Sequence, residues 1–252
     1  MASKTTMLFS LLAALLMLSF TATASMIIPA NDNAKENAKA PEKSPVIGDN
    51  WELERIDFIH YAKPVNPGKP PSTTTCYKLL GVKWKTFPVS YVINPSNPQS
   101  LPEGFVTSAI STAAETWDAA TSTELLNDAY AINYTARYGV QNYQNAIAFG
   151  DYPNDNVIAV TSVWYSPRGK QIVEFDMLFN TRFAWGNATS DATAMDLQNI
   201  ATHELGHGVG LADIYSTTCS AVTMYGYSSY GETSKRTLEQ PDIAGLWNMY
   251  GA

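Results

Sequence analysis

Several short segments of the chain alternate hydrophobic with other residues, which is the period of a β-strand. The segments predicted as strands are 87–93, 145–149, 157–165 and 172–179. In the last of these, apolar side chains alternate with Glu174 and Asp176, so we expect a strand with one buried face. The first half of the folded region is therefore predicted to be rich in strands.

Apolar residues at helical spacing follow in three places. The three predicted helices begin at Ser100, at Ser190 or Asp191, and at Pro241. Ser100 and Glu103 have the spacing of a capping box, and the second helix is expected to run to about Val209. Strands followed by helices predict an α+β fold.

The N-terminal third has a different composition. Residues 1–24 contain Lys4, an apolar run and a small-residue end, which predicts a cleaved signal peptide; an uncleaved membrane anchor is the alternative. Residues 25–75 contain many polar, proline and glycine residues, which predicts a pro-segment or flexible linker. Compact structure is expected to start near Cys76, so that 76–252 forms the folded domain.

Composition and charge narrow the function classes. Hydrophobic residues make up 45% of the 252 residues and charged residues 15%, which excludes a mostly disordered or coiled-coil chain. A net charge of −7 argues against nucleic acid or an anionic membrane as the partner. If the chain is secreted, Cys76 and Cys219 lie in an oxidising compartment, where one disulfide is expected.

The chemistry is concentrated in residues 202–213. His203 and His207 are four residues apart, so on a helix both imidazoles can bind one ion. Glu204 directly follows the first histidine, where its carboxylate can take a proton from a metal-bound water without being a ligand. Two imidazoles with one open position suit a catalytic Zn²⁺ ion.

Such a site needs a third protein ligand. Gly210 can adopt the left-handed conformation that ends a helix and returns the chain, so Asp213 can approach the ion. The chain has three histidines, and the third, His60, is the other candidate. The competing interpretation is a surface helix with coincidental spacing, which the positions of Gly210 and Asp213 disfavour.

The segment resembles the metzincin metallopeptidases, and most closely their matrixin-like branch. His203, Glu204, His207 and Gly210 match the His-Glu-x-x-His-x-x-Gly pattern. Residues 222–225 resemble the family's methionine turn, in which Met224 forms an apolar floor below the metal. The resemblance covers about 82–251 and implies that 76–252 is a metallopeptidase catalytic domain.

The resemblance also implies an architecture. It consists of a twisted mixed β-sheet of about five strands, an N-terminal helix, an active-site helix and a C-terminal helix. Segment 157–165 resembles the edge strand with which an extended peptide substrate pairs.

The sequence departs from the family in two ways. Asp213 stands where most metzincins have histidine, and Cys76 lacks the Pro-Arg-Cys-Gly context of the cysteine switch. The second departure favours a disulfide between Cys76 and Cys219. We expect one catalytic Zn²⁺ ion and no second, structural zinc; calcium near 151–156 is conceivable but unsupported.

The function that these features imply is a secreted, monomeric zinc endopeptidase acting on extended peptides, without nucleic-acid partners. His60 is expected to be an ordinary strand or pro-segment residue, Tyr225 a packing residue and Tyr227 a weaker candidate for stabilising the oxyanion. A secreted zinc-containing scaffold or binding protein without turnover is the alternative, and a metal-free cell-surface interaction domain is a third.

Overall fold

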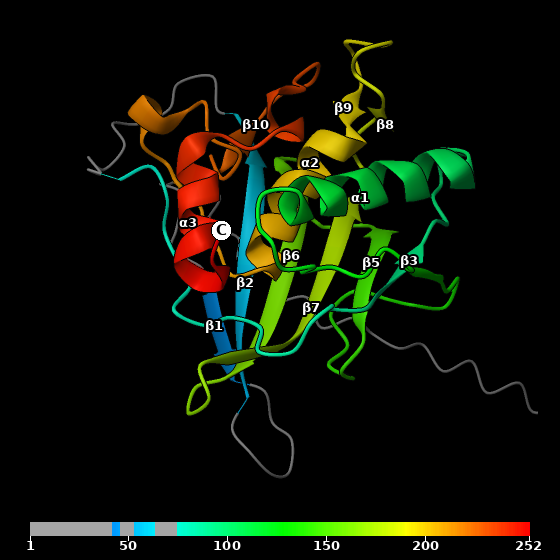
Figure 1. The fold of residues 1–252 in the computed structure, drawn as a ribbon. Coiled ribbons are helices and arrows are strands. Elements are labelled where there is room, and N and C mark those ends of the chain that lie inside the picture. Colours follow the sequence, from blue (N-terminus) through cyan, green and yellow to red (C-terminus); the bar gives the residue numbers. More distant parts are fainter. Residues whose placement is uncertain (1–41, 46–52, 64–74) are drawn as a thin grey trace, which may run out of the picture. The chain divides into compact units, whose positions relative to one another are not determined.

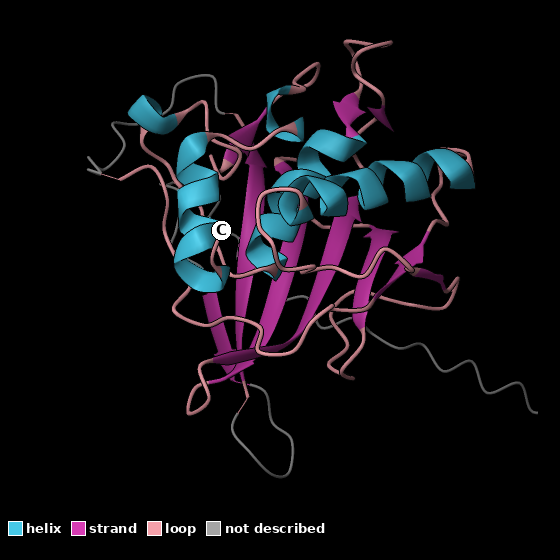
Figure 2. Cartoon of the chain, in the orientation of Figure 1, coloured by secondary structure: helices cyan, strands magenta, loops and turns pink. Residues whose placement is uncertain are grey.

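The computed structural model describes residues 42–45, 53–63 and 75–252, which belong to a single compact unit, Lys35–Ala252. An eight-stranded mixed sheet forms one layer, and helices α1 and α2 lie across one of its faces (Figure 1, Figure 2). The sheet contains β1 (Glu42–Pro45), β2 (Glu54–Ala62), β3 (Tyr91–Asn94), β4 (Ala131–Ile132), β5 (Asn145–Gly150), β6 (Val157–Ser166), β7 (Gln171–Asn180) and β10 (Tyr227–Ser228). The remaining elements are β8 (Trp185–Gly186), β9 (Met195–Asp196), α1 (Glu103–Asp118), α2 (Leu197–Gly208), α3 (Gln240–Tyr250) and the 3₁₀ turns η1 (Thr217–Cys219) and η2 (Ser234–Arg236). The predicted α+β fold is confirmed.

The strands lie in the order β1-β2-β6-β7-β5-β3-β4, with β10 also beside β2. β6 is antiparallel to both of its neighbours, β2 and β7, whereas β5 is parallel to both β7 and β3. The sheet has more than the five strands expected, partly because β1, β4 and β10 are only two to four residues long.

The prediction that compact structure starts near Cys76 is wrong, because strand β2 already belongs to the sheet. Its nine residues form a full strand of the sheet, although their region has the composition of a linker. The predicted disulfide is confirmed and joins Cys76 to Cys219 across 143 residues of sequence. The predicted signal peptide lies outside the described residues, and none of the helices within them is long and apolar enough to cross a membrane.

β7 is buried on both faces, which corrects the prediction of one buried face. Glu174 and Asp176 are 0% and 1% exposed. The Asp176 carboxylate accepts hydrogen bonds from the backbone N–H groups of Gly139 and Val140 at 2.7 and 3.2 Å, and Glu174 accepts from that of Asn142 at 2.9 Å. The acidic face therefore binds the preceding loop instead of facing water.

Two helix starts also differ from the prediction. No side chain caps α1, and Ser100 has a positive φ of 57°, so the expected capping box is absent there. α2 begins after Asp196, whose carboxylate accepts from the backbone N–H of Asn199 at 2.8 Å; the residues around 190 form turns. A serine three residues before a glutamate is a local pattern that also occurs in many loops. Tertiary contacts decide which residue caps a helix.

Helix α2 is fixed by close contact with the turn that contains Met224. Gly206 lies directly against the Met224 sulfur, and a Cβ atom there would also lie 2.7 Å from the Trp117 ring of α1. From the other side, the Asp242 carboxylate of α3 accepts from the backbone N–H groups of Thr223 and Met224 at 2.9 and 3.2 Å. Helices α2 and α3 therefore both contact this turn, and α1 packs against α2 beside it.

We predict that Gly206→Ala destabilises the protein by about 1–3 kcal/mol, because overpacking forces the Met224 or Trp117 side chain from its position. Gly104→Ala is the matched control: the Gly104 Cβ position is open, and alanine is the better helix former. Urea unfolding followed by circular dichroism measures both. Equal stability of the two variants would contradict the close approach of α2 to the methionine turn.

Candidate active site

His203, His207 and Asp213 bring three potential ligand atoms together. The two Nε2 atoms lie 3.2 Å apart, and Asp213 Oδ1 lies 3.2 Å from His203 Nε2 and 3.5 Å from His207 Nε2. The histidines come from successive turns of α2. Gly210, with a φ of 110°, redirects the chain so that Asp213 returns to them. The structure thus brings together the residues that the motif singled out.

The hydrogen bonds define the tautomer of both rings. His203 Nδ1 lies 2.7 Å from the carbonyl of Thr223, and His207 Nδ1 lies 2.9 Å from that of Leu211. A carbonyl can only accept, so each Nδ1 carries a proton, and in the neutral form of each ring Nε2 presents a lone pair. Asp213 Oδ1 is buried and has no hydrogen-bond partner. Three lone pairs therefore face one point.

This arrangement fits zinc. With Zn–N distances of about 2.0–2.1 Å, neighbouring ligands of a tetrahedral ion lie about 3.3 Å apart, which agrees with the three separations. Burial lowers the pKa of His203, which favours its neutral, metal-binding form. Despite its burial, the two histidines hold the pKa of Asp213 well below its usual range. A cation at this point satisfies the three atoms together.

Outer contacts orient Asp213, the candidate third ligand. The Tyr215 hydroxyl donates to Asp213 Oδ2 at 3.0 Å, which leaves Oδ1 directed toward the histidines. A Cβ atom at Gly226 would lie 3.0 Å from that Oδ1 and would collide with the Tyr215 ring. Tyr215 was not singled out by sequence analysis, because only its distance from Asp213 in space reveals its role.

Glu204 lies beside the cluster and is fully buried. Thr161 of β6 donates a hydrogen bond to its Oε2, and Oε1 lies 3.0 Å from His60 Nδ1. Burial raises the pKa of Glu204 to about 7. A carboxyl group with a pKa near neutrality can both accept and return a proton.

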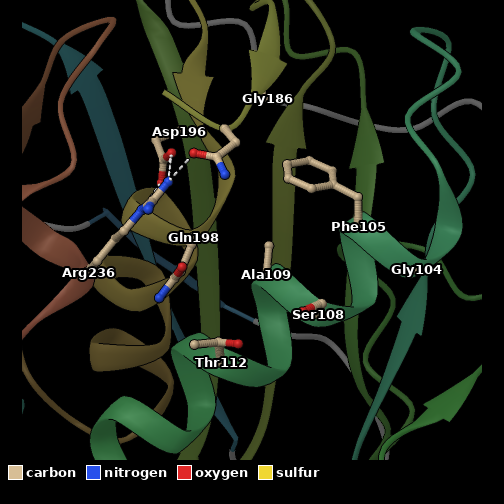
Figure 3. A pocket seen from close by; sticks show the side chains of 10 residues that line it. Gly104, Phe105, Ser108, Ala109, Thr112, Gly186, Asp196, Gln198 and Arg236 are labelled. Atoms are coloured by element: carbon tan, nitrogen blue, oxygen red, sulfur yellow. Dashed lines mark hydrogen bonds and ion pairs between the residues drawn. The ribbon is translucent and has the colours of Figure 1, made fainter. Parts of the chain in front are cut away.

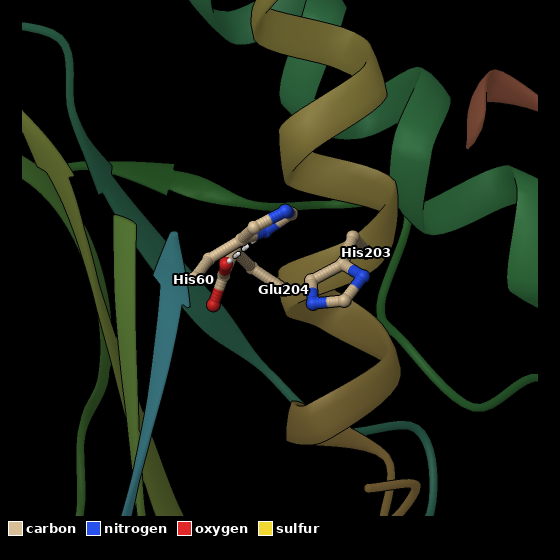
Figure 4. Close-up of side chains that lie close together, drawn as sticks. All are labelled: His60, His203 and Glu204. Atoms are coloured by element: carbon tan, nitrogen blue, oxygen red, sulfur yellow. Dashed lines mark hydrogen bonds and ion pairs between the residues drawn. The ribbon is translucent and has the colours of Figure 1, made fainter. Parts of the chain in front are cut away.

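His60 is the residue whose position the sequence analysis missed. Its ring centroid lies 4.0 Å from that of His203 (Figure 4). Its Nε2 lies 3.1 Å from the Ser228 hydroxyl. Both of its nitrogens thus have polar partners in Glu204 and Ser228, whereas Asp213 Oδ1 has no hydrogen-bond partner, which favours Asp213 as the third ligand. The available signal was the alternation of Ile56, Phe58 and His60.

The two tyrosines after Met224 pack as aromatic neighbours. The ring centroids of Tyr225 and Tyr227 lie 5.7 Å apart, and Tyr227 lies edge-on to Tyr215 at 5.4 Å. This agrees with the expectation for Tyr225. The suggested role of Tyr227 at the oxyanion stays a prediction.

Two other polar regions are already neutralised. Arg182 binds the carboxylates of Asp151 and Asp155 at 2.8 and 2.6 Å, in the loop considered for calcium. A hollow of about 250 Å³ lies between α1 and the start of α2, where Arg236 pairs with Asp196 (Figure 3). Neither region offers a free charge that competes with the histidine cluster as the reactive site.

Comparison with known proteins agrees with this geometry. The family model described as Matrixin matches residues 83–251. Stromelysin-1 of Mus musculus is 28% identical over 173 residues, and neutrophil collagenase of Homo sapiens is 30% identical over 172 residues; each match covers 67% of this chain and 33% of the relative. Matrix metalloproteinase-17 of Homo sapiens is 33% identical over 76 residues, which are 30% of this chain and 12% of that protein.

Since the family model covers more than half of the chain, the chain belongs to the matrixin family, as the resemblance predicted. It spans about a third of the length of stromelysin-1 and neutrophil collagenase.

We predict that Tyr215→Phe weakens zinc binding by about 10–100-fold, because loss of a hydrogen bond to a ligand lets that ligand rotate. Competition with a fluorescent zinc chelator at neutral pH measures the affinity. Tyr134→Phe is the matched control, since Tyr134 is exposed and its hydroxyl binds Glu103 far from the cluster. Equal affinities in the two variants would exclude Tyr215 from positioning Asp213.

Proposed function

We propose that this chain is a secreted zinc-dependent endopeptidase that hydrolyses peptide bonds in proteins or peptides. The observation that carries the proposal is the convergence of His203, His207 and Asp213 beside the Glu204 carboxylate. Membership of the matrixin family supports the same assignment. Secretion rests on the sequence of residues 1–24.

In this proposal His203, His207 and Asp213 are the metal ligands. Zinc, when bound, supplies a Lewis acid that polarises the substrate carbonyl and acidifies a water molecule. Glu204 takes the proton of that water and later returns it to the leaving amine. Met224 packs below the histidines and is not a ligand.

The substrate is proposed to bind as an extended strand. β6 contributes Thr161, which contacts Glu204, and its backbone runs past the site. A peptide that pairs with this backbone is held largely through main-chain hydrogen bonds, so recognition tolerates many sequences. We propose that the chain works as a monomer without nucleic-acid partners.

We predict that Glu204→Ala lowers kcat/KM for a quenched fluorescent peptide by about 10²–10⁴-fold, the usual contribution of a general base, while one zinc per chain is retained. Glu124→Ala, an exposed carboxylate, is the matched control and keeps the activity. Each full chain is preincubated, and kcat/KM is measured only after its peptidase rate has stopped changing. Elemental analysis measures zinc.

The outcomes separate the alternatives. Undiminished cleavage by Glu204→Ala would refute its role as the base. A wild-type chain that holds zinc but cleaves nothing in a random peptide mixture would indicate a binding scaffold. A chain without zinc, even after zinc is added, would refute the metal site.

A further inference from the structure

The edge of β6 that a substrate would need is occupied by the chain's own strand β2. Residues Glu54–Tyr61 of β2 pair antiparallel with Val157–Tyr165 of β6. The end of β2 also runs parallel to β10, through Tyr61 and Ala62. β6 is therefore an interior strand of this sheet and not the free edge that the sequence predicted (Figure 1).

The inward face of β2 covers the site formed by His203, His207 and Glu204. Ile56, Phe58 and His60 point inward and are 6%, 1% and 1% exposed. The Phe58 ring stacks on the His207 ring at a centroid distance of 4.0 Å and an interplanar angle of 11°. His60 contacts both His203 and Glu204 (Figure 4). With β2 in place, Glu204 has no exposed surface and a peptide cannot reach it.

The outward face and the end of β2 are also bound. The Asp57 carboxylate accepts from Arg55 Nε and from the Ser162 hydroxyl, both at 2.6 Å. At the end of the strand, the backbone N–H groups of Ala62 and Lys63 donate to the carbonyls of Asn156 and Ser228, both at 2.8 Å. β2 is thus docked along its whole length.

β2 lies outside the part of the chain that matches the family model and outside the strands that continue the sheet beyond β6. The matrixin match begins at residue 83, after β2. In the sheet, β2 lies outside β6, and among the described residues only the short strands β1 and β10 pair with its far side. Removal of β2 would leave the order β6-β7-β5-β3-β4 unchanged and expose the β6 backbone.

The geometry points to a latent enzyme: strand β2, residues Glu54–Ala62, is an intramolecular inhibitor that occupies the substrate edge of β6 and places Phe58 and His60 over the histidines and Glu204. This inference rests on the proposed function. Because β2 belongs to the same chain, its effective concentration at the edge is high, so a substrate in solution competes poorly until β2 departs.

The first test compares two variants of the full, zinc-loaded chain, one with a new charge on the inward face of β2 and one with a new charge on its outward face. Phe58→Asp places a carboxylate against His207 in the covered face, whereas Ile59→Asp is the matched control on the outward face. We expect the initial peptidase rate of Phe58→Asp, with intact mass verified, to exceed the wild-type rate at least tenfold. The rate of Ile59→Asp stays within twofold of wild type.

A second readout does not depend on activity. In a Glu204→Gln background, zinc removal by pyridine-2,6-dicarboxylate is followed in stopped flow. Release is expected to be at least tenfold faster when Phe58→Asp is added, and unchanged when Ile59→Asp is added.

A locked chain tests the same inference in the opposite direction. Asp57 and Ser162 are paired across β2 and β6, so Asp57→Cys with Ser162→Cys can form a disulfide between them. The oxidised chain is expected to stay at least tenfold below the constant rate that wild type reaches, and Ser162→Cys alone is its control. This arm decides the matter if Phe58→Asp does not fold.

The results that overturn the inference are specific. If the locked chain is as active as wild type, β2 does not block the site. The same conclusion follows if intact wild type cleaves peptide and releases zinc as fast as Phe58→Asp does. If no variant cleaves peptides while zinc release still depends on Phe58, the proposed function fails and the covering role of β2 stands.

Discussion

Three candidate ligand atoms that meet in a buried site are the constraint on which the rest of the structure depends. Two imidazole nitrogens and one carboxylate oxygen lie within 3.5 Å of one another, so a positive charge at their centre, such as a metal ion, stabilises all three. The surrounding fold supports that arrangement: carbonyls of Thr223 and Leu211 orient the rings, and Tyr215 orients the acid. Elements far apart in the sequence thus act on one small volume.

The same constraint explains how the helical half is packed. Asp242 of α3 holds the backbone of Thr223 and Met224, and the Thr223 carbonyl in turn holds His203. Gly206 lets α2 approach the methionine closely enough for this connection. The C-terminal helix is therefore linked to the orientation of His203 through the methionine turn.

The sequence predicted what depends on local spacing and missed what depends on distant partners. The four-residue interval of the histidines and the left-handed Gly210 are local, so the cluster could be predicted. The strand from Glu54 was taken for pro-segment or linker, because its partner β6 lies about a hundred residues later and His60 interrupts an otherwise apolar inward face. Burial of Glu174 and Asp176 was missed for the same reason, since the loop that covers them is not signalled by the strand itself.

A strand that closes its own active site must bind strongly enough to exclude substrate and weakly enough to leave a folded domain behind. Closure in about 99 of 100 molecules requires only about 3 kcal/mol, whereas burial of an aromatic or aliphatic side chain contributes about 1.5–3 kcal/mol. Ile56 and Phe58 together reach that range before any ladder hydrogen bond is counted. His60 works in the other direction, because a buried imidazole must keep both nitrogens bonded, and it does so only while Glu204 and Ser228 face it. Disturbance of either contact therefore favours release of β2 while the sheet behind it stays intact.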